Sequence, residues 1–320
     1  MEPLTVSRGG FLVAVAVSFG AAIVSPGCGG TSPAKVVDAE WPKVLRYSIS
    51  ISQENPESEA GRLDSVRRYL ERRMQMPVIV TGCTGYGVTI EAFRARKIEA
   101  ASIGPFAYLI ATRRTDVEAI ATRGTLDGEA RLYSGTLSVA AASPLHSVDD
   151  LVRHARELTI SFVDPASASG NLVQRAQLAS LGMSPERSFK KVVFTTNHMT
   201  SALTLVAGKV DVAAVGESII LMLVQTGKLH QGDIRPLWVS PRIPESPVAV
   251  RKDLPAAFRQ RLQRALLDMA AEDPEAYKNM TAKIYFERYR NTKFVAATDA
   301  DYEPIRKLFR GVEQLEGMEQ

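Results

Sequence analysis

Apolar residues between positions 44 and 275 recur at two spacings, and these spacings predict an alternation of strands and helices. In VLRYSISIS, residues 44–52, apolar side chains occupy every second position from Leu45 to Ile51, which is the period of a half-buried strand. RLDSVRRYLERRM, residues 62–74, has its apolar positions at helical spacing, and PVIVTG, residues 77–82, predicts a second strand. Such alternation favours α/β layers, whose ligands bind beyond the carboxyl ends of the strands.

An internal repeat is the most informative pattern in the chain. Residues 97–104 read KIEAASIG, and residues 209–216, which are 112 positions further on, read KVDVAAVG. Each copy follows an amphipathic segment, and Gly208 fits the C-terminal end of the second segment. The same offset pairs Tyr86 with His198, each just ahead of its helix. We interpret this as two similar lobes that each point a helix start into a shared cleft. The alternative is that helix, turn and strand recur by chance in an α/β chain.

A third loop carries small and hydroxyl residues between a strand and a helix. The stretch ELTISFVDP predicts a strand that ends at Val163, and ASASGN, residues 166–171, precedes the helical run LVQRAQLASLG. Small residues let backbone amides approach a ligand, and amides and serine hydroxyls donate hydrogen bonds to an oxyanion. The loop therefore suggests an anion cradle, and the alternative is a serine that only caps the helix.

Composition and charge narrow the function classes. With 320 residues, 45% hydrophobic residues, 23% charged residues and a mean hydropathy of -0.05, the chain is a folded protein, and its length suggests two domains. A net charge of +4 that is spread evenly does not indicate a nucleic-acid partner.

The chemistry-bearing residues indicate binding rather than catalysis. The sequence has no Gly-x-Ser-x-Gly or His-Glu-x-x-His motif and no carboxylates that the spacing pairs, so we expect no enzyme. We expect no cofactor and no metal, because His146, His154 and His230 have no partner at a ligand spacing. Cys83, in VIVTGCTGYG, is expected to be a small buried apolar residue rather than a nucleophile.

The N-terminal segment indicates where the protein is located. Arg8 precedes the apolar run FLVAVAVSFGAAIV, which is shorter than the roughly 18 residues that span a bilayer and is typical of a secretory signal. We therefore expect residues 1–27 to be a signal peptide. Cys28 resembles the acylated cysteine of bacterial lipoproteins, which predicts export to the periplasm or cell surface and a lipid anchor in the membrane. The alternative is ordinary cleavage nearby, which would leave Cys28 free.

Several longer stretches resemble the phosphonate and phosphite family of periplasmic solute-binding proteins that serve ABC transporters. They are GPFAYLIA at 104–111, VDPASASGNLV at 163–173, NH at 197–198, AGKVDVAAVGES at 207–218 and WVSPRIPESPVAVRKDLP at 238–255. The resemblance covers most of residues 44–275 in order.

The resemblance implies a type II periplasmic-binding fold, with two α/β lobes that each hold a mixed, mostly parallel sheet flanked by helices. We expect a tether over residues 28–42, lobe 1 over 43–136 plus 246–320, and lobe 2 over 137–245. The two hinge strands are expected near LSVAA, residues 137–141, and PLWVS, residues 236–240.

In that family tyrosines, a Ser-Thr-Ser-Gly turn and a histidine hold the oxyanion, and the resemblance transfers these roles to positions of this chain. Tyr86 and Tyr108 would be the ligands from the first lobe. Ser167 and Ser169 match the two serines of the turn, whereas Ala168 stands where the family has threonine, so one hydroxyl donor is missing.

The second half of the implied site contains the residues that bear on the substrate. His198 matches the family histidine, and Glu217 matches an acidic position that faces the organic end or a protonated oxygen of the ligand. Binders of aminoalkylphosphonates use an aspartate where this chain has Ser246, with Glu245 beside it. The resemblance thus implies a small phosphorus oxyanion, such as phosphite, phosphate or a simple phosphonate, rather than an aminoalkylphosphonate.

The expected function is the substrate-binding component of an ABC importer, acting as a monomer with the permease subunits in the membrane. Binding would use neutral hydrogen bonds and helix N-termini, because neither loop has a lysine or arginine beside the donors. Two alternatives stay open: a ligand-sensing module for a membrane partner, and an enzyme of the same fold that acts on a phosphorylated small molecule through His198 and Cys83.

Overall fold

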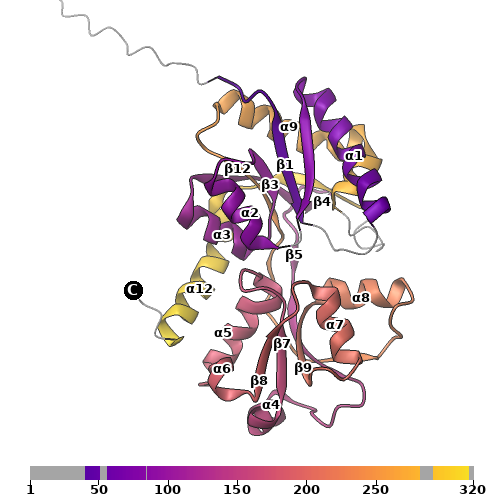
Figure 1. Cartoon of the computed structure of the whole chain (residues 1–320), viewed down its shortest axis with the longest axis vertical. Coiled ribbons are helices and arrows are strands. Elements are labelled where there is room, and N and C mark those ends of the chain that lie inside the picture. The colour runs from indigo at the N-terminus through magenta and orange to yellow at the C-terminus, as the bar shows by residue number, and fades with distance from the viewer. Residues whose placement is uncertain (1–39, 51–55, 84, 282–290, 317–320) are drawn as a thin grey trace, which may run out of the picture. The chain divides into compact units, whose positions relative to one another are not determined.

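The strands of the protein gather into two main β-sheets (Figure 1). The computed structural model describes residues 40–50, 56–83, 85–281 and 291–316. The first sheet has six strands in the order β13-β4-β12-β3-β1-β2. These are β1 Leu45–Ser50, β2 Val78–Cys83, β3 Ala100–Ser102, β4 Val117–Thr125, β12 Pro247–Arg251 and β13 Thr292–Ala296. β2 and β3 pair parallel with β1, whereas β12 and β13 pair antiparallel with their neighbours.

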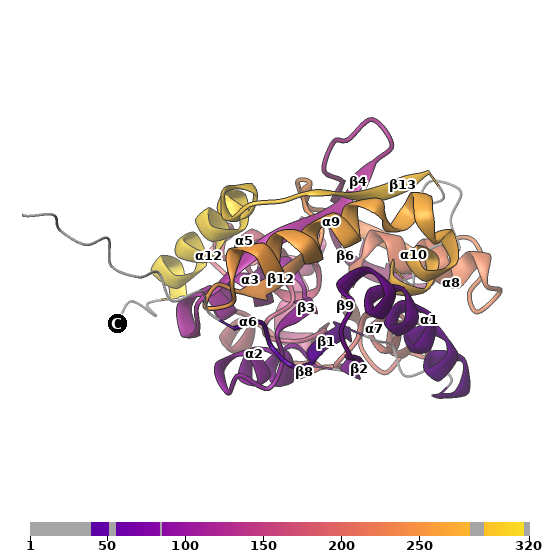
Figure 2. The same cartoon turned by 90° about the horizontal axis from the view of Figure 1, so that it is seen from above.

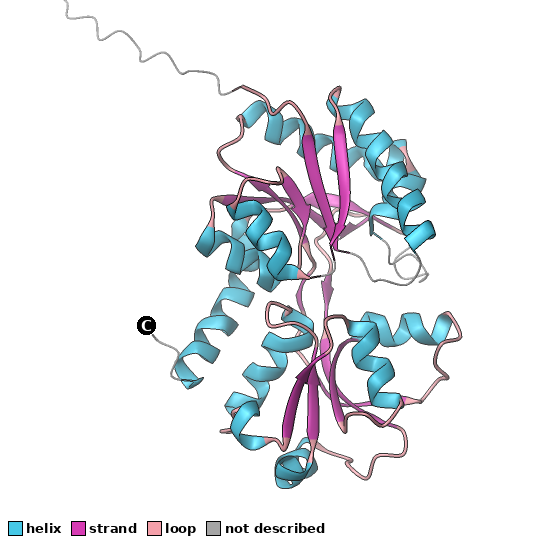
Figure 3. Cartoon of the chain, in the orientation of Figure 1, coloured by secondary structure: helices cyan, strands magenta, loops and turns pink. Residues whose placement is uncertain are grey.

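Helices cover both faces of this sheet (Figure 3), and we call the sheet and its helices lobe 1. The helices are α1 Pro56–Met74, α2 Tyr86–Arg94, α3 Pro105–Arg114, α9 Ala256–Glu272, α10 Pro274–Thr281 and α12 Glu303–Glu316. α1, α9 and α10 pack on one another, as Figure 2 shows, and share one hydrophobic cluster with β1. A second cluster joins α2, α3 and α12 on the other face.

The periodicity of the sequence identified the first elements of lobe 1 correctly. Leu45, Tyr47 and Ile49 of β1 are buried, as the alternation predicted, and pack in one cluster with Tyr69 and Leu70 of α1. Burial of each such side chain stabilises the fold by about 1.5 to 3 kcal/mol. The packing of this face thus follows from the two spacings.

The second sheet has five strands in the order β10-β6-β9-β7-β8, and we call it and its helices lobe 2. Its strands are β6 Gly135–Ala140, β7 Thr159–Phe162, β8 Lys191–Phe194, β9 Val212–Gly216 and β10 Ile234–Val239. Its helices are α4 Val148–His154, α5 Val173–Ser180, α6 Pro185–Ser188, α7 His198–Val206 and α8 Glu217–Gln225. A short 3₁₀ turn, η1 Ala155–Glu157, follows α4, and a π-helical turn, η2 Ala168–Leu172, precedes α5.

Both sheets are mixed and flanked by helices, as expected, but their antiparallel share is larger than expected. In lobe 2 only the pairs β7·β8 and β7·β9 are parallel, whereas β6 pairs antiparallel with β9 and β10. The antiparallel pairs arise from the topology, because the strands next to each passage between the lobes run antiparallel to their neighbours.

The chain passes between the lobes twice, and the two passages form a small antiparallel ladder. β5 Leu132–Tyr133 lies on the outward passage and β11 Ile243–Pro244 on the return. LSVAA and PLWVS, where hinge strands were expected, lie largely in β6 and β10 and belong to the sheet of lobe 2. The crossing segments therefore lie a few residues outside the expected ones. Ser240 N donates to the carbonyl oxygen of Gly135 at 2.9 Å, which holds the two passages together.

Candidate ligand-binding site

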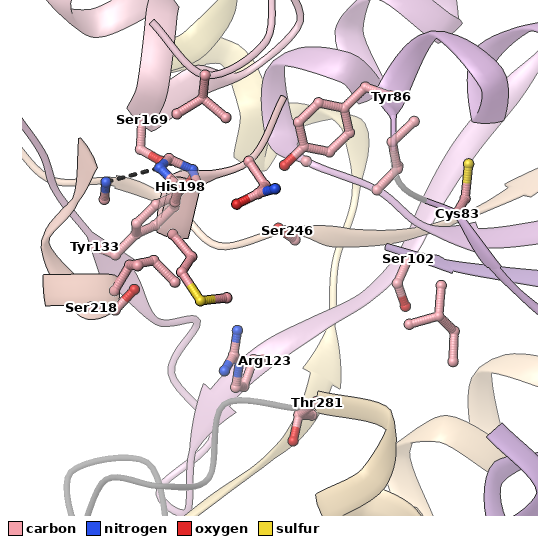
Figure 4. Close-up of a pocket in the computed structure, with 18 of the residues that line it drawn as sticks. Cys83, Tyr86, Ser102, Arg123, Tyr133, Ser169, His198, Ser218, Ser246 and Thr281 are labelled. Carbon is pink, nitrogen blue, oxygen red and sulfur yellow. Dashed lines mark hydrogen bonds between the residues drawn. The ribbon is translucent and has the colours of Figure 1, made fainter. Parts of the chain in front are cut away.

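The two copies of the repeat place one aromatic side chain from each lobe at the same cavity. Tyr86 is the first residue of α2 and His198 the first residue of α7, and the strands β3 and β9 follow these helices as predicted. Gly208 has φ +65°, as its predicted place at the end of α7 requires. Tyr86 and His198 both line a cavity of about 230 Å³ (Figure 4).

Polar side chains from both lobes and from the crossing segments line this cavity. They are Cys83, Tyr86, Ser102, Arg123, Tyr133, Ser169, Thr196, Asn197, His198, Ser218, Ser246 and Thr281. Four of the eight positions expected to bind ligand are among them: Tyr86, Ser169, His198 and Ser246. The other four, Tyr108, Ser167, Ala168 and Glu217, are not among the residues that line the cavity.

His198 is held in one orientation by the backbone of lobe 2. Gly216 N donates a hydrogen bond to His198 Nδ1 at 3.0 Å, so the proton of the neutral ring resides on Nε2. Nε2 lies 3.4 Å from Ser169 Oγ. The ring therefore presents an N–H donor beside the Ser169 hydroxyl, which suits an oxyanion.

Ser167 and Ala168 serve the structure of the loop. Ser167 is 1% exposed, and its Oγ accepts a hydrogen bond from Gly170 N at 3.1 Å, which makes it the N-cap of η2. Ala168 is 2% exposed and belongs to the hydrophobic cluster of α2 and α3. The capping alternative thus describes Ser167, and Ser169 is the residue of this turn that reaches the cavity.

Two tyrosines give the cavity neutral O–H donors. Burial, with a smaller effect from the Asp164 carboxylate, raises the pKa of Tyr86 to about 12. Burial also raises the pKa of Tyr133, whose hydroxyl has a hydrogen bond with Ser169. Both hydroxyls therefore stay protonated at physiological pH. Tyr133 lies on the crossing strand β5 and was not predicted, because no helix start or repeat marks that position.

Tyr108 and Glu217 lie apart from the lining of the cavity. The Tyr108 hydroxyl donates to Asp299 at 3.0 Å and accepts from Ala119 N at 3.1 Å, and its side chain is fully buried. Its ring packs edge-on against Tyr302, with centroids 5.0 Å apart. Glu217 begins α8, and the next residue, Ser218, lines the cavity instead.

A buried ion pair stands beside Ser246. Arg123 donates to Glu245 at 2.9 Å, and these side chains are 8% and 2% exposed. Arg123 lines the cavity from strand β4, outside the loops in which no lysine or arginine was expected. The charge in the middle of the buried strand β4 was the available signal in the sequence. Because Glu245 neutralises it, the pair adds little net charge to the site.

Cys83 is half-buried and lines the cavity, so it is less enclosed than the sequence predicted. Its Sγ donates to the carbonyl oxygen of Gly85 at 3.3 Å. Within the described residues, no three His, Cys, Asp or Glu side chains gather as a metal site would require. None of the helices in the described ranges has the length and apolar character of a membrane span. Cys28 and the expected signal peptide lie outside the described residues.

Comparisons with known proteins identify the family of the chain. A family described as "ABC transporter, phosphonate, periplasmic substrate-binding protein" matches residues 49–302. The phosphonates-binding periplasmic protein of Escherichia coli is 26% identical over 277 residues, which are 87% of this chain and 78% of that protein. The phosphate-import protein PhnD of Mycolicibacterium smegmatis is 24% identical over 304 residues, or 90% of this chain and 92% of that protein.

A solved structure supports the same fold. The binding protein component of an ABC phosphonate transporter from Pseudomonas aeruginosa superposes with a TM-score of 0.74 at 24% identity, covering 87% of this chain and 88% of that one. The family match extends over most of both lobes and includes every residue named above as lining the cavity. The chain therefore belongs to the family of periplasmic substrate-binding proteins of ABC phosphonate transporters.

Proposed function

We propose that this chain captures a small phosphorus oxyanion, namely phosphite, phosphate or a simple phosphonate, and delivers it to the permease of an ABC importer. The observation that carries the proposal is the convergence of Tyr86, Ser169 and His198 on one cavity from two lobes. A tetrahedral oxyanion has acceptor atoms on several sides, so it can receive donors from both lobes together.

The donor set is sufficient for useful affinity without a net cation. A hydrogen bond to a charged acceptor contributes roughly 1.5 to 3 kcal/mol, and a dissociation constant of 1 μM needs about 8.2 kcal/mol. Donors of Tyr86, Tyr133, Ser169 and His198 line the cavity and would supply this after the cost of association. A ligand that bridges the lobes selects the closed form, which the permease would recognise.

The Arg123–Glu245 pair supports the exclusion of aminoalkyl ligands. Ser246 offers a hydroxyl where the aminoalkyl binders have a carboxylate, and the carboxylate of the neighbouring Glu245 is already bonded to Arg123. An ammonium group in the cavity would therefore meet Arg123 without a carboxylate of its own. Export and anchoring through an acylated Cys28 remain part of the proposal.

Calorimetric titration of the mature chain against phosphite, phosphate, methylphosphonate and 2-aminoethylphosphonate tests the function. We expect binding of at least one of the first three, and weakening by about tenfold or more for Tyr86→Phe. Tyr108→Phe is the matched control, because its hydroxyl bonds to Asp299 and Ala119 in the core. No heat with all four ligands, or equal losses for the two variants, would overturn the proposal.

A further inference from the structure

The cavity is larger than a phosphorus oxyanion alone requires. Its volume of about 230 Å³ corresponds to seven or eight water-sized volumes of about 30 Å³ each. A methylphosphonate ion has about five non-hydrogen atoms, each comparable to one water, so it leaves space for two or three more. The remaining space can hold a substituent on the phosphorus atom.

An apolar wall also lines the cavity. We define it as Met199, Ile219, Met222, Met280 and Phe294. The first three come from α7 and α8 in lobe 2, and the last two come from α10 and β13 in lobe 1. Met280 and Phe294 are 4% and 6% exposed, so most of the apolar surface that a ligand could cover comes from lobe 2.

The labelled polar residues lie on more than one side of the cavity (Figure 4). Figure 4 shows Ser169, His198 and Tyr86 together on one side of the cavity, with Arg123 and Thr281 on another. Thr281 adjoins Met280 of the wall in sequence and ends α10. A ligand whose oxyanion lies at Ser169 and His198 would direct its substituent towards this region.

The side chains of the wall are suited to hydrocarbon. Met199, Ile219 and Met222 are only partly buried against the core of lobe 2, so they keep apolar surface that a ligand could cover. Methionine is unbranched and polarizable and adapts to irregular apolar groups. Among the described lining residues, Arg123 is the only Lys, Arg, Asp or Glu, and it is bonded to Glu245, so the lining offers an ammonium group no carboxylate.

We propose that the preferred ligand is a phosphonate whose substituent is an uncharged hydrocarbon group of about three carbons, bound on the apolar wall. This inference rests on the proposed function, because the oxyanion must first be held by Tyr86, Ser169 and His198. It adds the chemical nature of the organic end. The wall determines specificity, whereas the donors determine the binding of the head group.

Propylphosphonate and 2-aminoethylphosphonate are the decisive pair of ligands, because the two have equal chain length and differ in the charged terminal group. Calorimetry on the mature chain should show affinity rising from methyl- to ethyl- to propylphosphonate by up to about fourfold per methylene. Propylphosphonate should bind at least about tenfold more tightly than 2-aminoethylphosphonate, since the latter brings a cation to apolar surface.

Variants locate the effect on the wall. Met222→Gln and Met199→Gln should lower the affinity ratio of propyl- to methylphosphonate towards one, because they replace apolar surface by an amide of similar length. Leu203→Gln is the matched control on α7, since Leu203 is 38% exposed and does not line the cavity. It should keep the parent ratio. Thermal melting of each variant verifies that it is folded.

The outcomes separate the two proposals. Binding of methylphosphonate with no gain for propylphosphonate, or tighter binding of 2-aminoethylphosphonate, would overturn the inference and leave the proposed function intact. An equal ratio in parent, Met222→Gln and Met199→Gln would also overturn it. No binding of any phosphonate, phosphite or phosphate would overturn both.

Discussion

Substitution of Gly104 by alanine is a direct test of how the cavity is built, because it acts through the position of one ring. A Cβ atom at Gly104 would lie 2.9 Å from Cζ and 3.0 Å from both Cε1 and the hydroxyl oxygen of Tyr86. Carbon atoms in contact are normally about 3.5 to 4.0 Å apart, so the ring must move by about 0.5 Å or more. Gly104 has φ -59° and ψ 150°, which alanine adopts without strain.

The expected cost follows from the hydrogen bond that the ring would misplace. An O–H···O bond is best near 2.7 to 2.8 Å and weakens quickly when the oxygen is displaced. Loss of a bond to a charged acceptor costs about 1.5 to 3 kcal/mol, which is about tenfold to 150-fold in affinity. We therefore expect Gly104→Ala to weaken methylphosphonate binding by about tenfold or more, with a small change in stability.

The assay is calorimetry on Gly104→Ala, Tyr86→Phe and the double variant, with thermal melting of each. If alanine acts only by displacing the Tyr86 hydroxyl, it should cost little in the Tyr86→Phe background. Gly87→Ala is the control one residue from Tyr86, because its added Cβ meets nothing within 4 Å. Parent-like affinity of Gly104→Ala, or penalties that add fully in the double variant, would refute this reasoning.

Three further predictions concern the ion pair, a helix cap and the thiol. Glu245→Gln should lower the free energy of unfolding by about 3 to 5 kcal/mol in urea titrations, because Arg123 stays buried without its carboxylate; parent-like unfolding would contradict this. Asp150 lies in the first turn of α4 and accepts hydrogen bonds from the backbone amides of His146 and Ser147. These bonds, with that from His146 as the largest cause, help lower the pKa of Asp150 to about 2. The ionised Asp150 carboxylate therefore stabilises the fold above the usual pKa of 3.8. The difference in free energy of unfolding between parent and Asp150→Asn should shrink to nothing as the pH falls towards 2. Maleimide labelling of Cys83, followed by mass spectrometry, should slow severalfold with saturating methylphosphonate, and an unchanged rate would argue against a ligand in this cavity.

The helix starts were predictable because they follow a local rule. The repeat located Tyr86 and His198, since a helix that precedes a buried strand begins at the carboxyl edge of the sheet. The same logic led to the loop after β7, where Ser169 lines the cavity. Periodicity in sequence was sufficient at these positions because neighbouring residues alone decide where the helices start.

The remaining lining residues depend on how the chain crosses between the lobes. Tyr133 and Arg123 lie on strands β5 and β4, and they reach the cavity because two distant segments run side by side there. No spacing in the sequence encodes that meeting. Tyr108 illustrates the opposite case, because the family resemblance suggested a ligand contact, whereas Asp299 and Tyr302 from the far end of the chain enclose it in the core.

The pairing of Gly135 with Ser240 has a consequence for engineering. Gly135 N donates to Ser240 Oγ at 3.0 Å, and Ser240 N donates to the Gly135 carbonyl oxygen, so the segment between them begins and ends at one point. A segment whose ends lie close together is a favourable unit for exchange between homologues, provided that its packing on α3 and α12 is kept. The stretch 136–239 is thus a unit that could be exchanged between homologues. Such chimaeras would replace the lobe 2 part of the cavity lining and keep the lobe 1 part.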